Sequence, residues 1–150
     1  MALGFWARPN ITVILSADSA LERVEETYEE YTKAFDESKL SIKASEQPAR
    51  WKLRRLSHDA VVALESHEMG SWEQQYFAFR HALMSVSGFW TIKSEAGERE
   101  PLILSESDIE EGPYGQRIKL KWLRDANLPS LVIRGVGQWG IALIQGQIPF

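Results

Sequence analysis

Apolar and polar positions follow two different periods along this chain, so both strands and helices are expected. A β-branched and aliphatic run at 11–15 is typical of a strand. A second strand is expected to begin at Trp51, because Trp51 and Leu53 alternate with the basic residues Lys52 and Arg54. The polar stretch between these strands, 38–49, contains a proline and predicts a loop.

Helical spacing appears in four other segments. Capping-box patterns at Ser19–Glu22 and Ser71–Gln74 predict two helix starts, and Ser57 is expected to cap a helix from His58 to about His67. A helix is also favoured after Pro129, although a strand at 131–133 remains an alternative. The apolar stripes are Leu21, Val24, Tyr28, Tyr31 and Phe35 in the first helix, Trp72, Tyr76, Phe79, Leu83 and Val86 in the third, which should end at Gly88, and Val132, Val136, Trp139 and Leu143 in the last.

The region between Gly88 and Pro129 contains shorter elements. Residues 89–93 and 99–104 bracket a five-residue turn, which predicts a hairpin. Residues 105–115 are acidic and turn-rich, so they are expected to be exposed. The pattern of 116–126 fits a strand or a short helix, and its second half favours a helix. With 150 residues, 44% of them hydrophobic, the chain can build a real core. We therefore predict an α+β single domain over 1–150, with about four helices and a small antiparallel sheet.

Charge is distributed unevenly, although the net charge is only −4. An acidic surface is expected on the first helix, and a basic one on the strand that follows the loop. Opposite patches suit self-association or docking on a partner, whereas ordinary solvated faces are the simpler explanation. The acidic candidates are Glu25, Glu26, Glu29 and Glu30, and the basic candidates are Arg50, Lys52, Arg54 and Arg55.

Cysteine is absent, so disulfides and thiolate metal sites are excluded. The first ten residues lack a basic segment followed by a long apolar one, and no apolar run approaches the roughly 18 residues of a membrane span. We expect a protein of the cell interior that is neither secreted nor membrane-spanning.

Three glycines, Gly135, Gly137 and Gly140, match the G-x-G-x-x-G pattern of dinucleotide-binding folds. That chemistry needs a complete β-α-β unit and an acidic residue about 20 positions later. No acidic residue follows Gly140, and Trp139 places a large ring where phosphate would approach the backbone. No cofactor is predicted.

Catalytic motifs give no positive support for an enzyme. The histidines, His58, His67 and His81, lie in no metal-binding spacing, and nucleophile-elbow and P-loop patterns are absent. A small enzyme without a recognisable motif remains an alternative, and it would need a concave site that joins residues distant in sequence.

Nucleic-acid binding is a second alternative. Trp51 lies among the bases of 50–55, the minimum combination for base stacking with phosphate contact. However, Trp51 alternates in phase with Leu53 and fits a core position better, and the net charge is negative. A regulator that uses this strand is therefore the less favoured interpretation.

The segment Trp51–Ser57, a strand that leads directly into a helix, resembles small proteins of tailed bacteriophages, among them tail assembly chaperones and small virion components. In those phage proteins the segment is followed by a Gly-aromatic turn and then by a Leu/Pro-rich helix. The corresponding residues of this chain are Gly88-Phe89-Trp90 and 128–132. The resemblance implies a non-catalytic protein that acts through protein contacts in virion or tail assembly, inside the host cell or in the virion. Its partners would be other protein subunits, including further copies of itself, and Phe5, Trp6 and Trp139 are the aromatic candidates for that contact.

Overall fold

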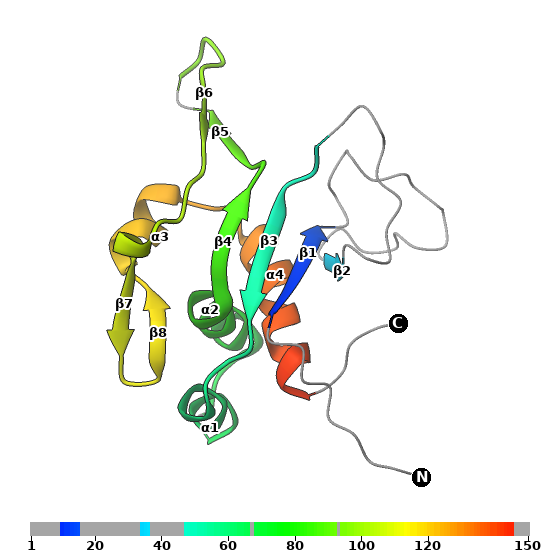
Figure 1. The fold of residues 1–150 in the computed structure, drawn as a ribbon, viewed down its shortest axis with the longest axis vertical. Helices are drawn as coiled ribbons and strands as arrows, with labels where there is room; N and C mark the ends of the chain where they lie inside the picture. The colour runs from blue at the N-terminus through cyan, green and yellow to red at the C-terminus, as the bar shows by residue number, and fades with distance from the viewer. Residues whose placement is uncertain (1–9, 16–33, 37–46, 67, 93, 146–150) are drawn as a thin grey trace.

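The computed structural model describes residues 10–15, 34–36, 47–66, 68–92 and 94–145. Their elements confirm the predicted α+β class, with four helices, one four-stranded sheet and two two-stranded sheets, and every strand pairing is antiparallel. Figure 1 shows the larger sheet at the centre, with the smaller sheets beside it.

The four-stranded sheet has the order β2-β1-β3-β4. Both predicted strands are confirmed, as β1 (Asn10–Leu15) and β3 (Arg50–Arg54), and they pair with Val13 opposite Trp51. The outer strands are β2 (Ala34–Asp36) and β4 (Leu83–Ser87). Alternation places Trp51 and Leu53 in the core and leaves Lys52 and Arg54 only half-buried, as expected for a sheet covered on one face.

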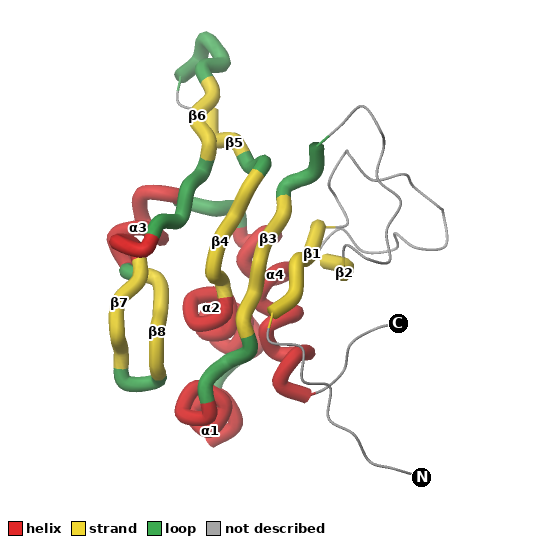
Figure 2. Tube along the Cα trace, viewed as in Figure 1, coloured by secondary structure: helices red, strands yellow, loops and turns green. Residues whose placement is uncertain are grey.

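Four helices are present: α1 (His58–Ser66), α2 (Ser71–Ala82), α3 (Leu120–Ala126) and α4 (Ser130–Gln145). Ser57 caps α1 as predicted, because its Oγ accepts a hydrogen bond from the Ala60 N–H at 3.1 Å. Figures 1 and 2 show α4 lying behind the larger sheet, with α2 beside it.

The three glycines of the dinucleotide-like pattern lie within α4, so they form no phosphate-binding loop, and the strand alternative at 131–133 is wrong. A Cβ on Gly137 would overlap the backbone carbonyl of Gln75, and one on Gly140 would lie 3.3 Å from the Cβ atoms of Ala78 and Ala82. Gly137 and Gly140 therefore serve packing, because they let the backbones of α2 and α4 approach closely.

Two helix predictions need correction. The helix expected from 20 falls mostly outside the described residues, but Phe35 lies in β2. The capping box at Ser71 is absent, since Gly70 is the N-cap of α2 without a side-chain hydrogen bond, and this helix ends at Ala82. Leu83 is already extended, with φ −66° and ψ 124°. Pairing with β3, for example Val86 opposite Trp51, replaces the last predicted turn because sheet hydrogen bonds override a weak helical pattern.

The predicted hairpin is confirmed as β5 (Trp90–Ile92) and β6 (Arg99–Pro101). Residues 105–115, expected to be turn-rich and exposed, are all exposed or half-buried. A short 3₁₀ turn, η3 (Glu106–Asp108), is followed by a second hairpin, β7 (Ile109–Gly112) and β8 (Gly115–Ile118). Gly115 allows this tight connection because its φ of +101° is a conformation that other residues rarely adopt. The helix favoured in the second half of 116–126 is confirmed as α3.

Candidate interaction surface

Large apolar side chains are exposed on the β5–β6 hairpin. Trp90 is 53% exposed and Ile92 is 72% exposed, and Trp90 pairs directly with Pro101, which is also exposed. Directly opposed residues of an antiparallel pair share one face. We call Trp90, Ile92 and Pro101 the hairpin ridge. Ile103, two residues beyond Pro101, is 64% exposed and extends the apolar surface toward the body of the molecule.

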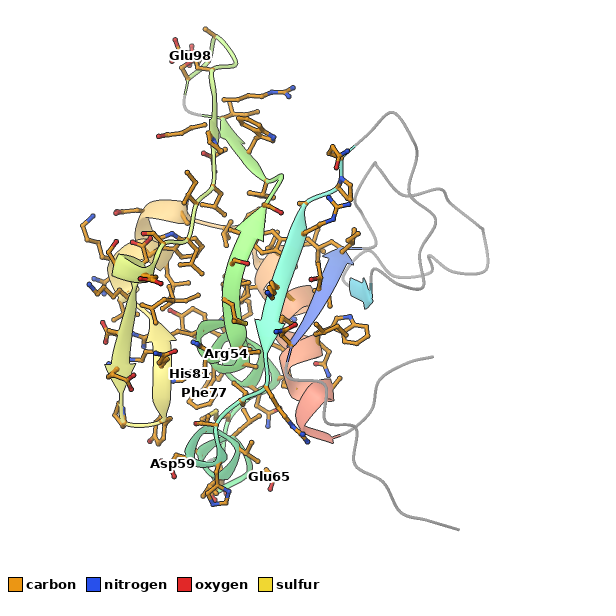
Figure 3. All side chains as sticks on the ribbon, viewed as in Figure 1. Arg54, Asp59, Glu65, Phe77, His81 and Glu98 are labelled. Carbon is orange, nitrogen blue, oxygen red and sulfur yellow. The ribbon has the colours of Figure 1, made fainter. Side chains whose placement is uncertain are left out.

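The base of the hairpin is fixed to the core while its tip projects away from the body, where Figure 3 labels Glu98. Phe89 and Leu102 are joined by a backbone hydrogen bond of 2.9 Å and pack against the core. The Phe89 ring lies 5.3 Å from that of Trp51. Gly88 precedes this base at φ +74°, and a Cβ there would lie 2.6 Å from the Pro48 carbonyl oxygen. The core thus sets the direction in which the hairpin ridge is presented.

A polar cluster lies where the end of β3, α2 and the β7–β8 hairpin meet. The Arg54 guanidinium donates from Nε to the His81 carbonyl oxygen at 3.2 Å and from Nη1 to Gln116 Oε1 at 2.7 Å. His81 Nδ1 donates to the Phe77 carbonyl oxygen at 2.8 Å, and the His81 ring stacks on Phe77 with centroids 4.1 Å apart. Figure 3 labels Arg54, His81 and Phe77 close together at this junction.

Two cavities border His81, although its side chain is only 5% exposed. One, of about 210 Å³, is lined by Arg54, Arg55, Ser57, His81, Tyr114 and Gln116. The other, of about 250 Å³, is lined by Met69, Trp72, Glu73, Tyr76, Phe77, Arg80 and His81. The first cavity joins residues distant in sequence, which is the feature that the small-enzyme alternative requires.

Burial lowers the pKa of His81 below its ordinary 6.5. The hydrogen bond with Phe77 acts in the opposite direction, and the charges of Arg80, Arg117 and Arg54 lower the pKa further. Burial also lowers the pKa of Arg54, against the opposing effect of Glu111. The cluster therefore favours a neutral imidazole beside a partly desolvated guanidinium.

The basic segment 50–55 does not form the stacking platform that the nucleic-acid alternative needs. Trp51 is fully buried, so no base can stack on its ring. Arg54 bonds within the protein, and Arg50 donates to Gln47 Oε1 at 3.2 Å. Lys52 is half-buried and Arg55 is exposed beside the smaller cavity. The structure brings Arg54 and Arg55 together at one cavity.

Of the predicted aromatic contact residues, Trp139 is only 5% exposed and lies in the core, so its assignment as an exposed contact residue is wrong. It sits on the apolar stripe of α4 that packs inward, as the helical spacing itself indicates. Phe5, Trp6 and the four glutamates Glu25, Glu26, Glu29 and Glu30 lie outside the described residues.

Sequence reasoning missed the hairpin ridge. The signal was present in the hairpin itself, because Trp90 and Ile92 share one face of a two-stranded sheet that is too narrow to bury both of its faces.

Among the described residues, no group of three or more histidine, aspartate or glutamate side chains could hold a metal ion. His58 is exposed at the start of α1, and His67 lies outside the described part of the chain. No helix in that part combines the length and apolar character required to cross a membrane.

Comparisons were made with family models, with curated proteins and with solved structures, and none of them gave a match.

Proposed function

We propose that this chain is a non-catalytic protein that works through contact with other protein subunits, and that the hairpin ridge is one of its contact surfaces. The observation that carries the proposal is the exposure of Trp90 and Ile92 side by side on a projecting hairpin. Aromatic side chains supply much of the binding energy at protein interfaces, because they bury a large area with few rotatable bonds.

The partner on this surface is a second copy of the same chain. Pairing two ridges across a two-fold axis would bury Trp90 and Ile92 of both copies, since such an axis brings the same surface of each subunit together. The hairpin also has only two strands, so its outer backbone edges can accept a further strand. Arg99, which pairs with Ile92, would lie at the rim of this contact, where charges affect association rate more than affinity.

The biological role that fits is a structural or assembly component of a tailed phage, acting in the host cell and in the virion. This part of the proposal rests on the resemblance of 51–57, 88–90 and 128–132 to such proteins. In the fold these segments are β3 with its turn into α1, the start of the hairpin, and the start of α4. The Gly-aromatic turn, 88–90, thus leads directly into β5, the first strand of the hairpin that carries the ridge.

Light-scattering mass after size-exclusion chromatography tests the contact surface, over a tenfold range of concentration. The wild-type chain is expected to increase in mass with concentration, and a Trp90→Ser/Ile92→Ser double variant is expected to remain a monomer. Val62→Ser is the matched control, because Val62 is an exposed apolar residue on α1, away from the hairpin. A wild-type monomer at all concentrations, or a double variant that associates like wild type, would overturn the proposal.

A further inference from the structure

Two residues beside the smaller cavity carry buried polar atoms that form no hydrogen bond with the described part of the chain. These atoms are His81 Nε2 and Arg54 Nη2. They belong to two of the residues that line this cavity of about 210 Å³. Buried polar groups in folded proteins are almost always paired, so two such atoms at one cavity indicate a missing partner.

Arg54 and Arg55 supply positive charge at the cavity wall, and none of the lining residues in the described part of the chain is acidic. Glu106, Glu110 and Glu111 line a neighbouring cavity that Arg54 also borders. Glu110 is engaged with Arg117 at 2.9 Å, and Glu111 acts on Arg54 only through its field. A partly buried guanidinium without a carboxylate in contact carries a desolvation cost that a bound anion would offset.

The hydrogen-bonding pattern narrows the chemistry of that anion. Because His81 Nδ1–H donates to the Phe77 carbonyl, Nε2 of the neutral ring is an acceptor. Arg54 Nη2 is a donor. A complementary ligand must therefore accept from the guanidinium and donate to the imidazole. Hydrogen phosphate does both, since it carries acceptor oxygens and an O–H group.

We propose that the cavity between β3, α2 and the β7–β8 hairpin binds a small phosphate-class oxyanion, held between Arg54 and His81. The volume suits a small ligand, because it lies below the roughly 300 Å³ at which pockets for larger organic molecules begin. This site is separate from the hairpin ridge, and the inference does not depend on the proposed function.

Access to the two atoms requires a small movement of the cavity wall, because both are shielded from solvent in the structure. The Tyr114 ring, which lines the cavity, lies 6.2 Å from the His81 ring and is carried on the turn of the β7–β8 hairpin. The turn is attached to α1 by the Ser57 hydroxyl, which donates to the Tyr114 carbonyl oxygen at 2.6 Å.

Isothermal titration calorimetry with inorganic phosphate at pH 7 is the direct test, with sulfate at matched ionic strength as the comparison ion. Sulfate has the same shape but no O–H at this pH. Saturable phosphate binding is expected, with sulfate at least about tenfold weaker, the free-energy equivalent of one net hydrogen bond. Arg54→Gln should weaken phosphate binding by at least about tenfold, whereas Arg50→Gln, at the far end of β3, should leave it unchanged.

His81→Asn provides a second variant, because the asparagine amide can retain a donor near the Nδ1 position while removing the Nε2 acceptor. Its phosphate affinity should fall toward that of sulfate for the wild-type protein. Equal binding of both ions, tighter binding of acetate than of phosphate, binding unaffected by Arg54→Gln, or no saturable binding would each overturn the proposal.

An independent readout is the His81 imidazole, followed by NMR with and without phosphate. Charged and titratable groups around it include Arg54 and Arg55 at the end of β3, Glu73, Tyr76 and Arg80 on α2, Tyr114 at the turn, Arg117 on β8, and Glu110 and Glu111 on β7. Bound phosphate should raise the pKa of His81, since an anion beside the ring favours its protonated form. A His81 titration identical in both conditions would contradict binding between these two residues.

Discussion

Gly137 on α4 and Gln75 on α2 approach so closely that the hydrogen of Gly137 faces the Gln75 backbone carbonyl, and no side chain fits between them. The same two helices are linked at their surface by Gln75 Nε2, which donates to Gln138 Oε1 at 3.1 Å. This close contact fixes how α2 and α4 cross, and the two helices provide much of the core behind the sheet.

Gly137→Ala is expected to destabilise the fold by about 1–3 kcal/mol, because the new methyl group must push the two backbones apart. Helix propensity alone predicts the opposite sign, a gain of up to about 1 kcal/mol. The unfolding free energy, measured by urea unfolding followed by circular dichroism, distinguishes these two expected effects of Gly137→Ala. Gly140→Ala is the graded control, since its Cβ would meet only two alanine methyl groups at 3.3 Å, and a stability within about 1 kcal/mol of wild type is expected. A Gly137→Ala variant more stable than wild type would contradict the packing.

Trp51→Ala should cost about 3–5 kcal/mol, the usual range for removing a buried aromatic side chain. Trp51 is fully buried between the rings of Phe79 and Phe89, whose centroids lie 6.4 and 5.3 Å away. The matched control is Trp90→Ala on the hairpin ridge, expected to change the unfolding free energy of the monomer by no more than about 0.5 kcal/mol. Denaturant midpoints measured at low protein concentration compare the two. Equal losses would show that the hairpin, too, is part of the cooperative core.

Ser57→Ala removes two hydrogen bonds with one substitution. The Oγ atom accepts from the Ala60 N–H and donates to the Tyr114 carbonyl, so it joins the start of α1 to the β7–β8 turn. A loss of about 1–2 kcal/mol in unfolding free energy is expected from the cap alone. Ser66→Ala, exposed at the other end of α1, should have a much smaller effect. Faster amide hydrogen exchange in 112–116 of the Ser57→Ala variant would show that the turn has been released, and unchanged exchange there would contradict the link.

The stability of the fold should fall as pH decreases from about 6.5. The pKa of His81 is lowered in the folded state, so the unfolded chain binds a proton first, and acid favours unfolding. The stability contributed by the neutral His81 is fully present above the pKa that this residue has in the unfolded chain. It is lost as pH falls toward the lower pKa of His81 in the folded protein. Thermal unfolding at pH 8, 6.5 and 5 measures the trend in phosphate-free buffer. His81→Asn should show a smaller loss over this interval, and an equal loss in both proteins would assign the pH dependence to other groups.

Much of this fold could be predicted from local pattern. The strands at 11–15 and 51–54, the Ser57 cap, the β5–β6 hairpin and the helix in the second half of 116–126 all follow from alternation, capping and turn chemistry. The errors lie where pairing with distant residues decides the outcome. Leu83 and Val86 continue the helical spacing of α2, but residues 83–87 form backbone hydrogen bonds with the edge of β3 and become a strand.

The candidate sites depend more strongly on tertiary structure. Trp139 lies on the apolar stripe of α4 and is buried, whereas Trp90 lies on a two-stranded hairpin and is exposed. The cavity beside His81 joins residues from 54 to 116 in the sequence, so no local spacing could reveal it. Arg54 appeared as a solvated base of a strand, whereas the structure gives it two hydrogen bonds to distant groups.

The direct passage from α2 into β4, with Ala82 the last helical residue and Leu83 the first of the strand, leaves no spare residue at this joint. Side chains along a strand point alternately to its two faces, so inserting a single amino acid there would invert the whole of β4. Leu83 would leave the core, while the phase of α2 against α4 would stay unchanged. This joint is therefore a poor place for length variation, whereas the tip of the β5–β6 hairpin, where Gly97 has open space around it, can accept added residues at little cost.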